Sequence, residues 1–133
     1  MKILALHCDY VRYEPIEKEI KYAEDTEKKK YEIKEVLLLL TAIEVNDNEE
    51  TIQKCLEEIK RISKEIAARR ILIYPFAHLS KELKRPSEAI KILAKLREEA
   101  SKIIETHSAP FGWNKSLELK IKGHPLAERL LTI

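Results

Sequence analysis

The chain has 133 residues, of which 44% are hydrophobic and 36% are charged, and its 25 basic and 23 acidic side chains leave a formal net charge of +2. This is the length of one domain with a real hydrophobic core, and the composition excludes a disordered chain. The near balance of charge does not by itself indicate a nucleic-acid binder, although local basic clusters such as Lys28 to Lys30 could form a basic rim if the fold brings several of them together. The dense mixture of both signs resembles the ion-pair networks of heat-adapted proteins.

The cysteines and the apolar runs indicate a cytoplasmic protein that does not contact a membrane. Cys8 and Cys55 form no Cys-x-x-Cys motif and are expected to be reduced thiols in the core. The longest apolar run, Val36 to Ala42, is too short to cross a membrane. We find no signal peptide before the first predicted strand.

The first half of the chain predicts two strands. Lys2 to His7 is an apolar run of strand length. Val11 to Lys30 is charged and contains Pro15, which predicts an exposed, partly irregular excursion. Val36 to Ile43 is apolar, has β-branched ends and precedes the turn residues Asn46 to Asn48, which favours a long buried strand over a leucine helix.

Two helices are predicted from apolar positions that recur at helical spacing. Asp47 and Glu50 have capping-box spacing, and the helix that they open ends near Arg69-Arg70, where basic residues suit the helix dipole. The second helix begins at Pro86. The apolar faces consist of Ile52, Cys55, Leu56, Ile59, Ile62 and Ile66 in the first helix and of Ala89, Ile90, Leu93, Leu96, Ala100, Ile103 and Ile104 in the second.

The remaining elements complete a mixed α/β (α+β) domain. Ile71 to Tyr74 is a short strand that Pro75 ends. Leu117 to Ile121 alternates apolar and polar residues, which predicts a half-buried strand, and a short helix is expected from Leu126 to Leu131. Helices with a single apolar stripe pack on one face of a sheet, so we predict a mixed β-sheet with amphipathic helices on one face.

Two stretches, Tyr74 to Ser80 and Ala109 to Glu128, place Pro, Phe and Gly beside polar side chains. Lys115 has the parity of the apolar face of its strand, so we expect it at the first residue of that strand with its amine in a polar cleft. The alternative is a lysine that extends to solvent at a sheet edge. The two stretches supply a polar set in which Lys and His could orient water or stabilise charge and Glu could act as a counter-ion to the lysine. The set consists of His78, Asn114, Lys115 and Glu128.

Several common chemistries are disfavoured. No serine lies in a Gly-x-Ser-x-Gly turn, and the Rossmann glycine fingerprint and the P-loop are absent. No two histidines have the i, i+4 spacing of a helical zinc site, so we expect no metal.

Three separated motifs, at residues 74–80 (Tyr-Pro-Phe-Ala-His-Leu-Ser), 109–112 (Ala-Pro-Phe-Gly) and 122–128 (Lys-Gly-His-Pro-Leu-Ala-Glu), resemble the amino-terminal editing domain of archaeal threonyl-tRNA synthetase. The likeness extends from Lys2 to Glu128. It implies a fold similar to D-aminoacyl-tRNA deacylases, a homodimer, no cofactor in this domain, and hydrolysis of serine wrongly attached to tRNA(Thr). It also implies that the free 2′-hydroxyl of the terminal adenosine assists.

The resemblance also implies where substrate binds. According to the resemblance, His78, Lys115 and Glu128 match polar, catalytic positions of the family's pocket. Position 114 departs from the family, where we expect Tyr and find Asn114. The remaining positions would form a pocket wall or hold the aminoacyl group with backbone: Ala42, Ile43, Glu44, Pro75, Phe76, Ala77, Phe111 and Gly112.

Other functions stay open at this point. A D-aminoacyl-tRNA deacylase is the second candidate, although the Ser-Gln-x-Thr-type motif of the freestanding enzymes is not found. A non-catalytic module that docks tRNA or dimerises a parent synthetase is the third, and a small-molecule enzyme of mixed-sheet fold is the fourth. Because no aminoacylation domain follows, we expect residues 1–133 to be one domain of a longer synthetase, with the tRNA acceptor end and the other synthetase domains as partners.

Overall fold

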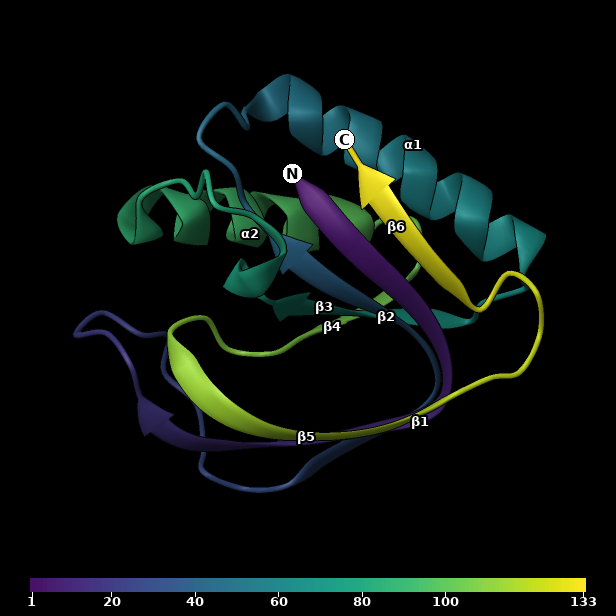
Figure 1. Ribbon diagram of the computed structural model, residues 1–133, viewed down its shortest axis with the longest axis horizontal. Coiled ribbons are helices and arrows are strands. Elements are labelled where there is room, and N and C mark those ends of the chain that lie inside the picture. Colours follow the sequence, from purple (N-terminus) through teal and green to yellow (C-terminus); the bar gives the residue numbers. More distant parts are fainter.

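The computed structural model of the protein describes residues 1–133 and contains a six-stranded mixed sheet with two α-helices (Figure 1). The sheet order is β4-β3-β2-β1-β5, and β6 pairs with the first part of β1. The strands are β1 (Lys2–Lys18), β2 (Tyr31–Ala42), β3 (Arg70–Pro75), β4 (Glu105–Ser108), β5 (Trp113–Ile121) and β6 (Glu128–Thr132), and the helices are α1 (Glu49–Glu65), α2 (Pro86–Ala100) and the 3-10 helix η1 (Ala77–Leu79).

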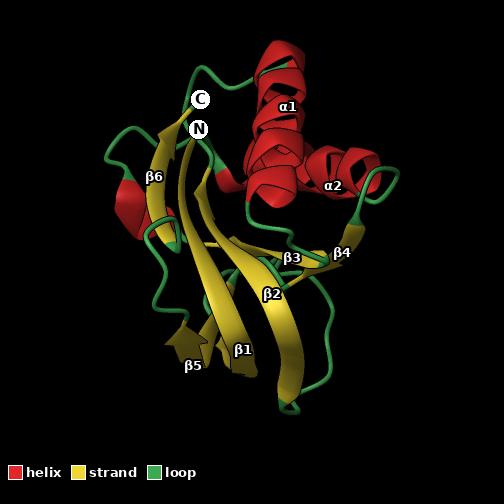
Figure 2. Ribbon diagram, turned by 90° about the vertical axis from the view of Figure 1, so that its right-hand side faces the viewer, coloured by secondary structure: helices red, strands yellow, loops and turns green.

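Both α-helices lie on the same side of the sheet, as predicted (Figure 2). Their apolar stripes pack against the side chains that β1, β2 and β3 direct toward them, including Ile3, Leu37 and Ile71. The fold class predicted from the sequence is therefore confirmed. Neither α-helix combines the length and apolar character that a membrane span requires.

The opposite face of the sheet is covered by the sheet itself. The second half of β1 and all of β5 curl beneath β3, β4 and the two α-helices (Figure 1), and they enclose a second core that contains Val11, Tyr13, Leu38 and Tyr74. In β2, Leu37 and Leu39 face the helices whereas Leu38 and Leu40 face the second core. The continuous apolar run of β2 therefore exists because both of its faces are buried.

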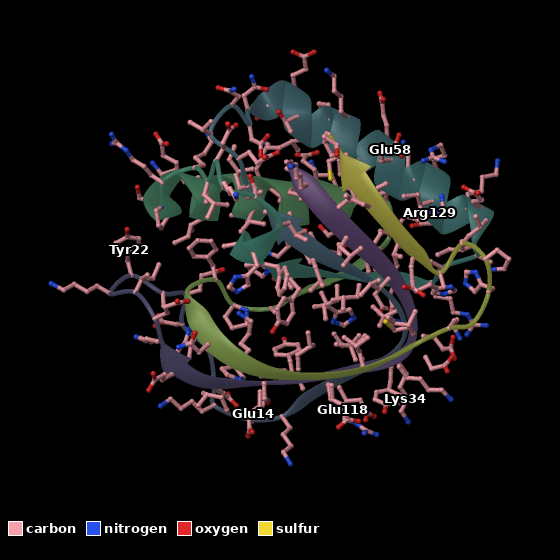
Figure 3. All side chains as sticks on the ribbon, viewed as in Figure 1. Glu14, Tyr22, Lys34, Glu58, Glu118 and Arg129 are labelled. Atoms are coloured by element: carbon pink, nitrogen blue, oxygen red, sulfur yellow. The ribbon has the colours of Figure 1, made fainter.

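The predicted excursion from Val11 to Lys30 is wrong in its first half, because β1 continues to Lys18. Val11, Tyr13 and Pro15 are buried on the inner face, while polar residues between them face outward, as Glu14 does in Figure 3. Pro15 lies beyond the end of the pairing of β1 with β2 at Tyr13 and beside a register shift in the pairing of β1 with β5, and a strand tolerates proline at such edge and bulge positions. The period-two pattern was hidden by the high charge of this stretch.

The predicted helix from Leu126 to Leu131 is also wrong, because Glu128 to Thr132 form strand β6. This strand pairs antiparallel with Lys2 to Leu6 of β1. Arg129 lies beside α1 and its guanidinium contacts Glu65 at 3.2 Å (Figure 3). Good helix formers adopt a strand here because the free edge of β1 supplies backbone partners.

The helix ends differ from the predicted ones. Asn48 caps α1 in a reciprocal capping box with Thr51, and α1 ends at Glu65. Asp47 instead accepts a hydrogen bond from the Met1 ammonium at 2.6 Å. The second helix begins at Pro86 as predicted but ends at Ala100. The four residues of β4, which follow that helix and pair in parallel with β3, were not predicted.

Candidate functional site

A cavity of about 410 Å³ lies where β2 and β3 end and β5 begins. The start of α2 and the segment after β1 complete its wall. Residues from both predicted stretches take part, together with residues from four other parts of the chain. The lining residues are Glu19, Ile20, Thr41, Ala42, Ile43, Tyr74, Pro75, Phe76, Ala77, His78, Leu83, Lys84, Pro86, Ala89, Leu93, Phe111, Gly112, Trp113, Asn114 and Lys115.

The turn before β5 is fixed by the segment that follows β1. The Glu24 carboxylate accepts a hydrogen bond from the Phe111 amide at 2.9 Å, and the Trp113 indole donates to the Glu24 carbonyl at 2.6 Å. Gly112 has φ +82°, and a Cβ there would lie 2.7 Å from a side-chain carbon of Ile20. Only glycine fits both the backbone conformation and the close approach.

Lys115 extends into this cavity from β5, where it is the third residue and not the first as predicted. Its Nζ donates hydrogen bonds to the carbonyl oxygens of Pro110 at 3.1 Å and Trp113 at 3.0 Å. It also lies 4.8 Å from the centre of the Tyr74 ring. An ammonium has three N–H donors, so one remains for a water or a substrate oxygen.

The environment of Lys115 changes its protonation. Burial lowers the pKa of Lys115 to about 8, and the more distant charges of Glu19 and Glu24 oppose that shift. No carboxylate lies within ion-pair distance of the amine. A cation that is partly buried and not neutralised by a carboxylate exerts a strong electrostatic effect on bound substrate.

Ten of the predicted site residues line the cavity. His78 belongs to η1, is exposed, and its ring meets the Phe76 ring edge-on at 5.0 Å between centres. Asn114 is exposed at the start of β5. The ten are Ala42, Ile43, Pro75, Phe76, Ala77, His78, Phe111, Gly112, Asn114 and Lys115.

Two predicted site residues do not reach the cavity. Glu128 is an exposed residue of β6 opposite Leu6 of β1, whereas Lys115 pairs with Pro15, nine positions further along that strand. The structure therefore does not support Glu128 as the counter-ion of Lys115. Glu44 accepts a hydrogen bond from the Ser80 hydroxyl at 2.6 Å and contacts the Met1 ammonium at 2.9 Å, so it ties η1 to the first residue of the chain.

Sequence reasoning missed several cavity residues. Tyr74 and Trp113 lie within the two predicted stretches but were not named as site residues, although each directly precedes one that was, Pro75 or Asn114. Glu19 and Ile20 carry no local signal, because they are brought to the cavity by the hydrogen bond from the Glu19 amide to the Gly112 carbonyl at 2.8 Å.

A second polar cluster lies at the other end of β5. The Lys122 ammonium contacts Asp9 at 2.6 Å and Glu35 at 2.7 Å, and the hydrogen bond to Asp9 is the main reason that its pKa is raised. His7 Nδ1 and His124 Nε2 are 2.8 Å apart. No group of three or more His, Cys, Asp or Glu side chains is arranged to hold a metal ion.

Known proteins resemble this chain along its whole length. The family described as the Archaea-specific editing domain of threonyl-tRNA synthetase matches residues 1–133. A threonine–tRNA ligase of Nitrosopumilus maritimus is 42% identical over 129 residues, which are 96% of this chain and 21% of that ligase. A threonine–tRNA ligase of Pyrococcus horikoshii is 42% identical over 139 aligned residues, covering 100% of this chain and 22% of that ligase. The chain thus spans about a fifth of the length of the curated relatives it matches.

A solved structure shares the fold. The c-Myc DNA Unwinding Element Binding Protein has a TM-score of 0.77 to this chain at 11% identity, and the match covers 100% of this chain and 99% of the other. At that identity the likeness shows the fold alone.

The class that the family match defines is the editing domain of an aminoacyl-tRNA synthetase. Within that class, the chain belongs to the Archaea-specific editing domains of threonyl-tRNA synthetase, because the family match covers every residue. The family resemblance that the three sequence motifs predicted is therefore confirmed.

Proposed function

We propose that this domain hydrolyses the ester bond of L-seryl-tRNA(Thr) and leaves L-threonyl-tRNA(Thr) intact. The observation that carries the proposal is the amine of Lys115, which reaches a cavity walled by small and apolar residues without a carboxylate partner. The family supports the proposal, because an editing domain of threonyl-tRNA synthetase acts in proofreading.

A synthetase needs such a site for a physical reason. A site built for threonine rejects serine weakly, since the missing methyl group is worth only about 1–3 kcal/mol of discrimination. A second site corrects this if it accepts serine and excludes threonine by size. Ala42, Ile43 and Phe76 provide a close apolar wall for that purpose.

The cavity is larger than an amino-acid side chain. Its volume of about 410 Å³ is within the range of small-molecule sites and suits an aminoacyl group together with part of the terminal adenosine. Size exclusion is therefore expected from the local wall around the serine side chain and not from the total volume.

The proposed reaction needs no cofactor. Water adds to the ester carbonyl carbon, the bond from that carbon to the ribose oxygen breaks, and the products are serine and tRNA with a free terminal hydroxyl. Lys115 donates its remaining N–H to the attacking water or to the negative charge that develops on the carbonyl oxygen. His78 shapes the rim, and the 2′-hydroxyl of the terminal adenosine assists, so loss of one side chain weakens the reaction without abolishing it.

The test measures loss of the ester under single-turnover conditions with L-seryl-tRNA(Thr), L-threonyl-tRNA(Thr) and a D-aminoacyl-tRNA. The proposal predicts rapid hydrolysis of the seryl ester and slower hydrolysis of the other two. Preference for the D-aminoacyl substrate would identify a D-aminoacyl-tRNA deacylase. Intact esters throughout would leave a module that docks tRNA without catalysis.

The assembly is part of the same proposal. We expect the domain to act as a homodimer, attached to the remaining domains of a threonyl-tRNA synthetase, on the acceptor end of tRNA(Thr). Sedimentation equilibrium tests the dimer directly, and a monomer at all concentrations would remove it from the proposal.

A further inference from the structure

The Lys115 ammonium is held by an aromatic ring where most buried cations have a carboxylate. Its Nζ lies 4.8 Å from the centre of the Tyr74 ring, within the range of a cation–π contact. The two carbonyl oxygens of Pro110 and Trp113 complete its protein contacts. All three partners attract the cation, and none of them carries a net charge.

The Tyr74 ring is itself fixed in place. Tyr74 is 5% exposed and belongs to the second core. The rings of Tyr13 and Tyr74 meet edge to face, with their centres 6.0 Å apart and their planes at 89°. Tyr13 also stacks on Tyr31, with ring centres 4.9 Å apart. Three strands therefore contribute to a packed aromatic column that ends at the Lys115 amine.

We propose that Tyr74 is a positioning residue of the editing site: its ring face fixes the Lys115 ammonium in the cavity and keeps it charged without neutralising it. A carboxylate in the same place would pair with the ammonium and cancel most of its field at the substrate. The ring attracts the cation through its quadrupole, so the full charge remains available to the developing oxyanion. The inference rests on the proposed role of Lys115 in ester hydrolysis.

Three replacements of Tyr74 separate the effect of the aromatic ring face from the effects of the hydroxyl group and of side-chain shape. Tyr74→Phe keeps the aromatic face and loses the hydroxyl. Tyr74→Leu removes the ring. Replacement of Tyr74 by pentafluorophenylalanine keeps the shape of a ring but removes its negative face, so it tests the contact even if Tyr74→Leu does not fold. Leu72→Ala is the matched control, since Leu72 is a fully buried residue of the same strand and the same core.

Two measurements decide the inference. The pKa of the Lys115 amine is measured by NMR titration, with Lys115→Met used to assign its signal, and ester hydrolysis is measured as a function of pH. Tyr74→Phe should keep the wild-type pKa of Lys115 and the wild-type rate of ester hydrolysis. The fluorinated ring and Tyr74→Leu should lower the pKa by about one unit, the scale of one cation–π contact. At pH 7.5 this should slow seryl ester hydrolysis about threefold, because the charged fraction of an amine whose pKa starts at about 8 falls from about three quarters to about one quarter. Leu72→Ala should lower stability and leave the pKa unchanged.

The inference is overturned if the fluorinated ring leaves the Lys115 pKa at the wild-type value, or if Leu72→Ala changes it equally. The NMR titration does not depend on catalysis. If the wild-type domain hydrolysed no ester, the proposed function would fail, while the titration would still show whether Tyr74 holds the ammonium.

Discussion

Lys115 and Lys122 lie near opposite ends of β5, and their environments differ both in burial and in the partners of the ammonium. Lys122 contacts two carboxylates, of Asp9 and Glu35, and its pKa is raised. Lys115 contacts two carbonyls and an aromatic ring, and burial lowers its pKa to about 8. The paired lysine links strands, whereas the unpaired lysine keeps an available charge in a cavity. In the proposed mechanism, a lysine that is buried beside uncharged partners keeps its field available to substrate, whereas a lysine paired with two carboxylates serves to link strands.

The comparison is tested most strongly by Lys115→Met. We expect seryl ester hydrolysis to fall about 100-fold, the usual effect of removing one donor to a developing oxyanion. We also expect the melting temperature to rise at neutral pH, because the substitution removes a cation whose burial is unfavourable. Single-turnover kinetics and thermal unfolding measure the two effects. An unchanged rate would remove Lys115 from the mechanism.

The pH dependence sharpens the same contrast. If the charged amine is the active form, hydrolysis corrected for the spontaneous reaction should decrease above an apparent pKa of about 8, approaching tenfold per pH unit. Lys115→Met should lack this alkaline limb, and Lys122→Met should keep it. A wild-type rate that rises through this range would instead indicate that the neutral amine acts as a base.

Gly112→Ala tests the turn that supplies carbonyl partners to Lys115. The new Cβ would meet Ile20 at 2.7 Å and Ala23 at 3.0 Å, and the backbone at φ +82° is unfavourable for alanine. We expect a loss of about 1–3 kcal/mol of stability, together with slower hydrolysis. Gly123→Ala is the matched control, because no atom lies within 4 Å of its added Cβ. Equal stability of the two variants would contradict the close packing of the turn.

Lys122→Met removes the lysine of this comparison that is paired with carboxylates. It leaves the carboxylates of Asp9 and Glu35 without their shared cation, so we expect a smaller fall in melting temperature than for Gly112→Ala. Hydrolysis should be unchanged. Raising the salt concentration should reduce the difference from wild type, since exposed ion pairs are screened. A large loss of hydrolysis would show that the two ends of β5 are coupled.

The smallest expected effect concerns His7, which lies in the same cluster as Lys122. Burial, and then the neighbouring His124 and Lys122, lower the pKa of His7 below its usual 6.5, while Asp9 and Glu35 oppose this. The unfolded chain therefore binds a proton before the folded one does, so stability should decrease as pH falls below about 6.5. Urea unfolding between pH 7 and pH 5 measures this, and His7→Gln should flatten the dependence. Equal slopes in the two proteins would exclude His7 as its source.

Local patterns predicted most of the elements correctly. The long strand β2, the start of α2 at Pro86 and the strand that carries Lys115 follow from periodicity and from proline chemistry. The second half of β1 and the strand β6 were misassigned, because charge hid an alternating pattern in one and helix-forming residues fill the other. The second half of β1 is held by pairing with β2 and β5, and β6 is held by pairing with the first part of β1. These partners are distant in sequence, so a local sequence pattern does not reveal them.

The sequence by itself determined which residues are apolar on which face, the two stretches that border the cavity, the parity that turns Lys115 inward and the motifs that identify the family. Tertiary structure alone decided that Glu128 lies far along β1 from Lys115, that Glu24 holds the turn around Gly112 and that Tyr74 faces the amine. The reason is physical: periodicity depends on neighbours a few residues apart, whereas the partners of a charge come from strands that the curl of the sheet brings together.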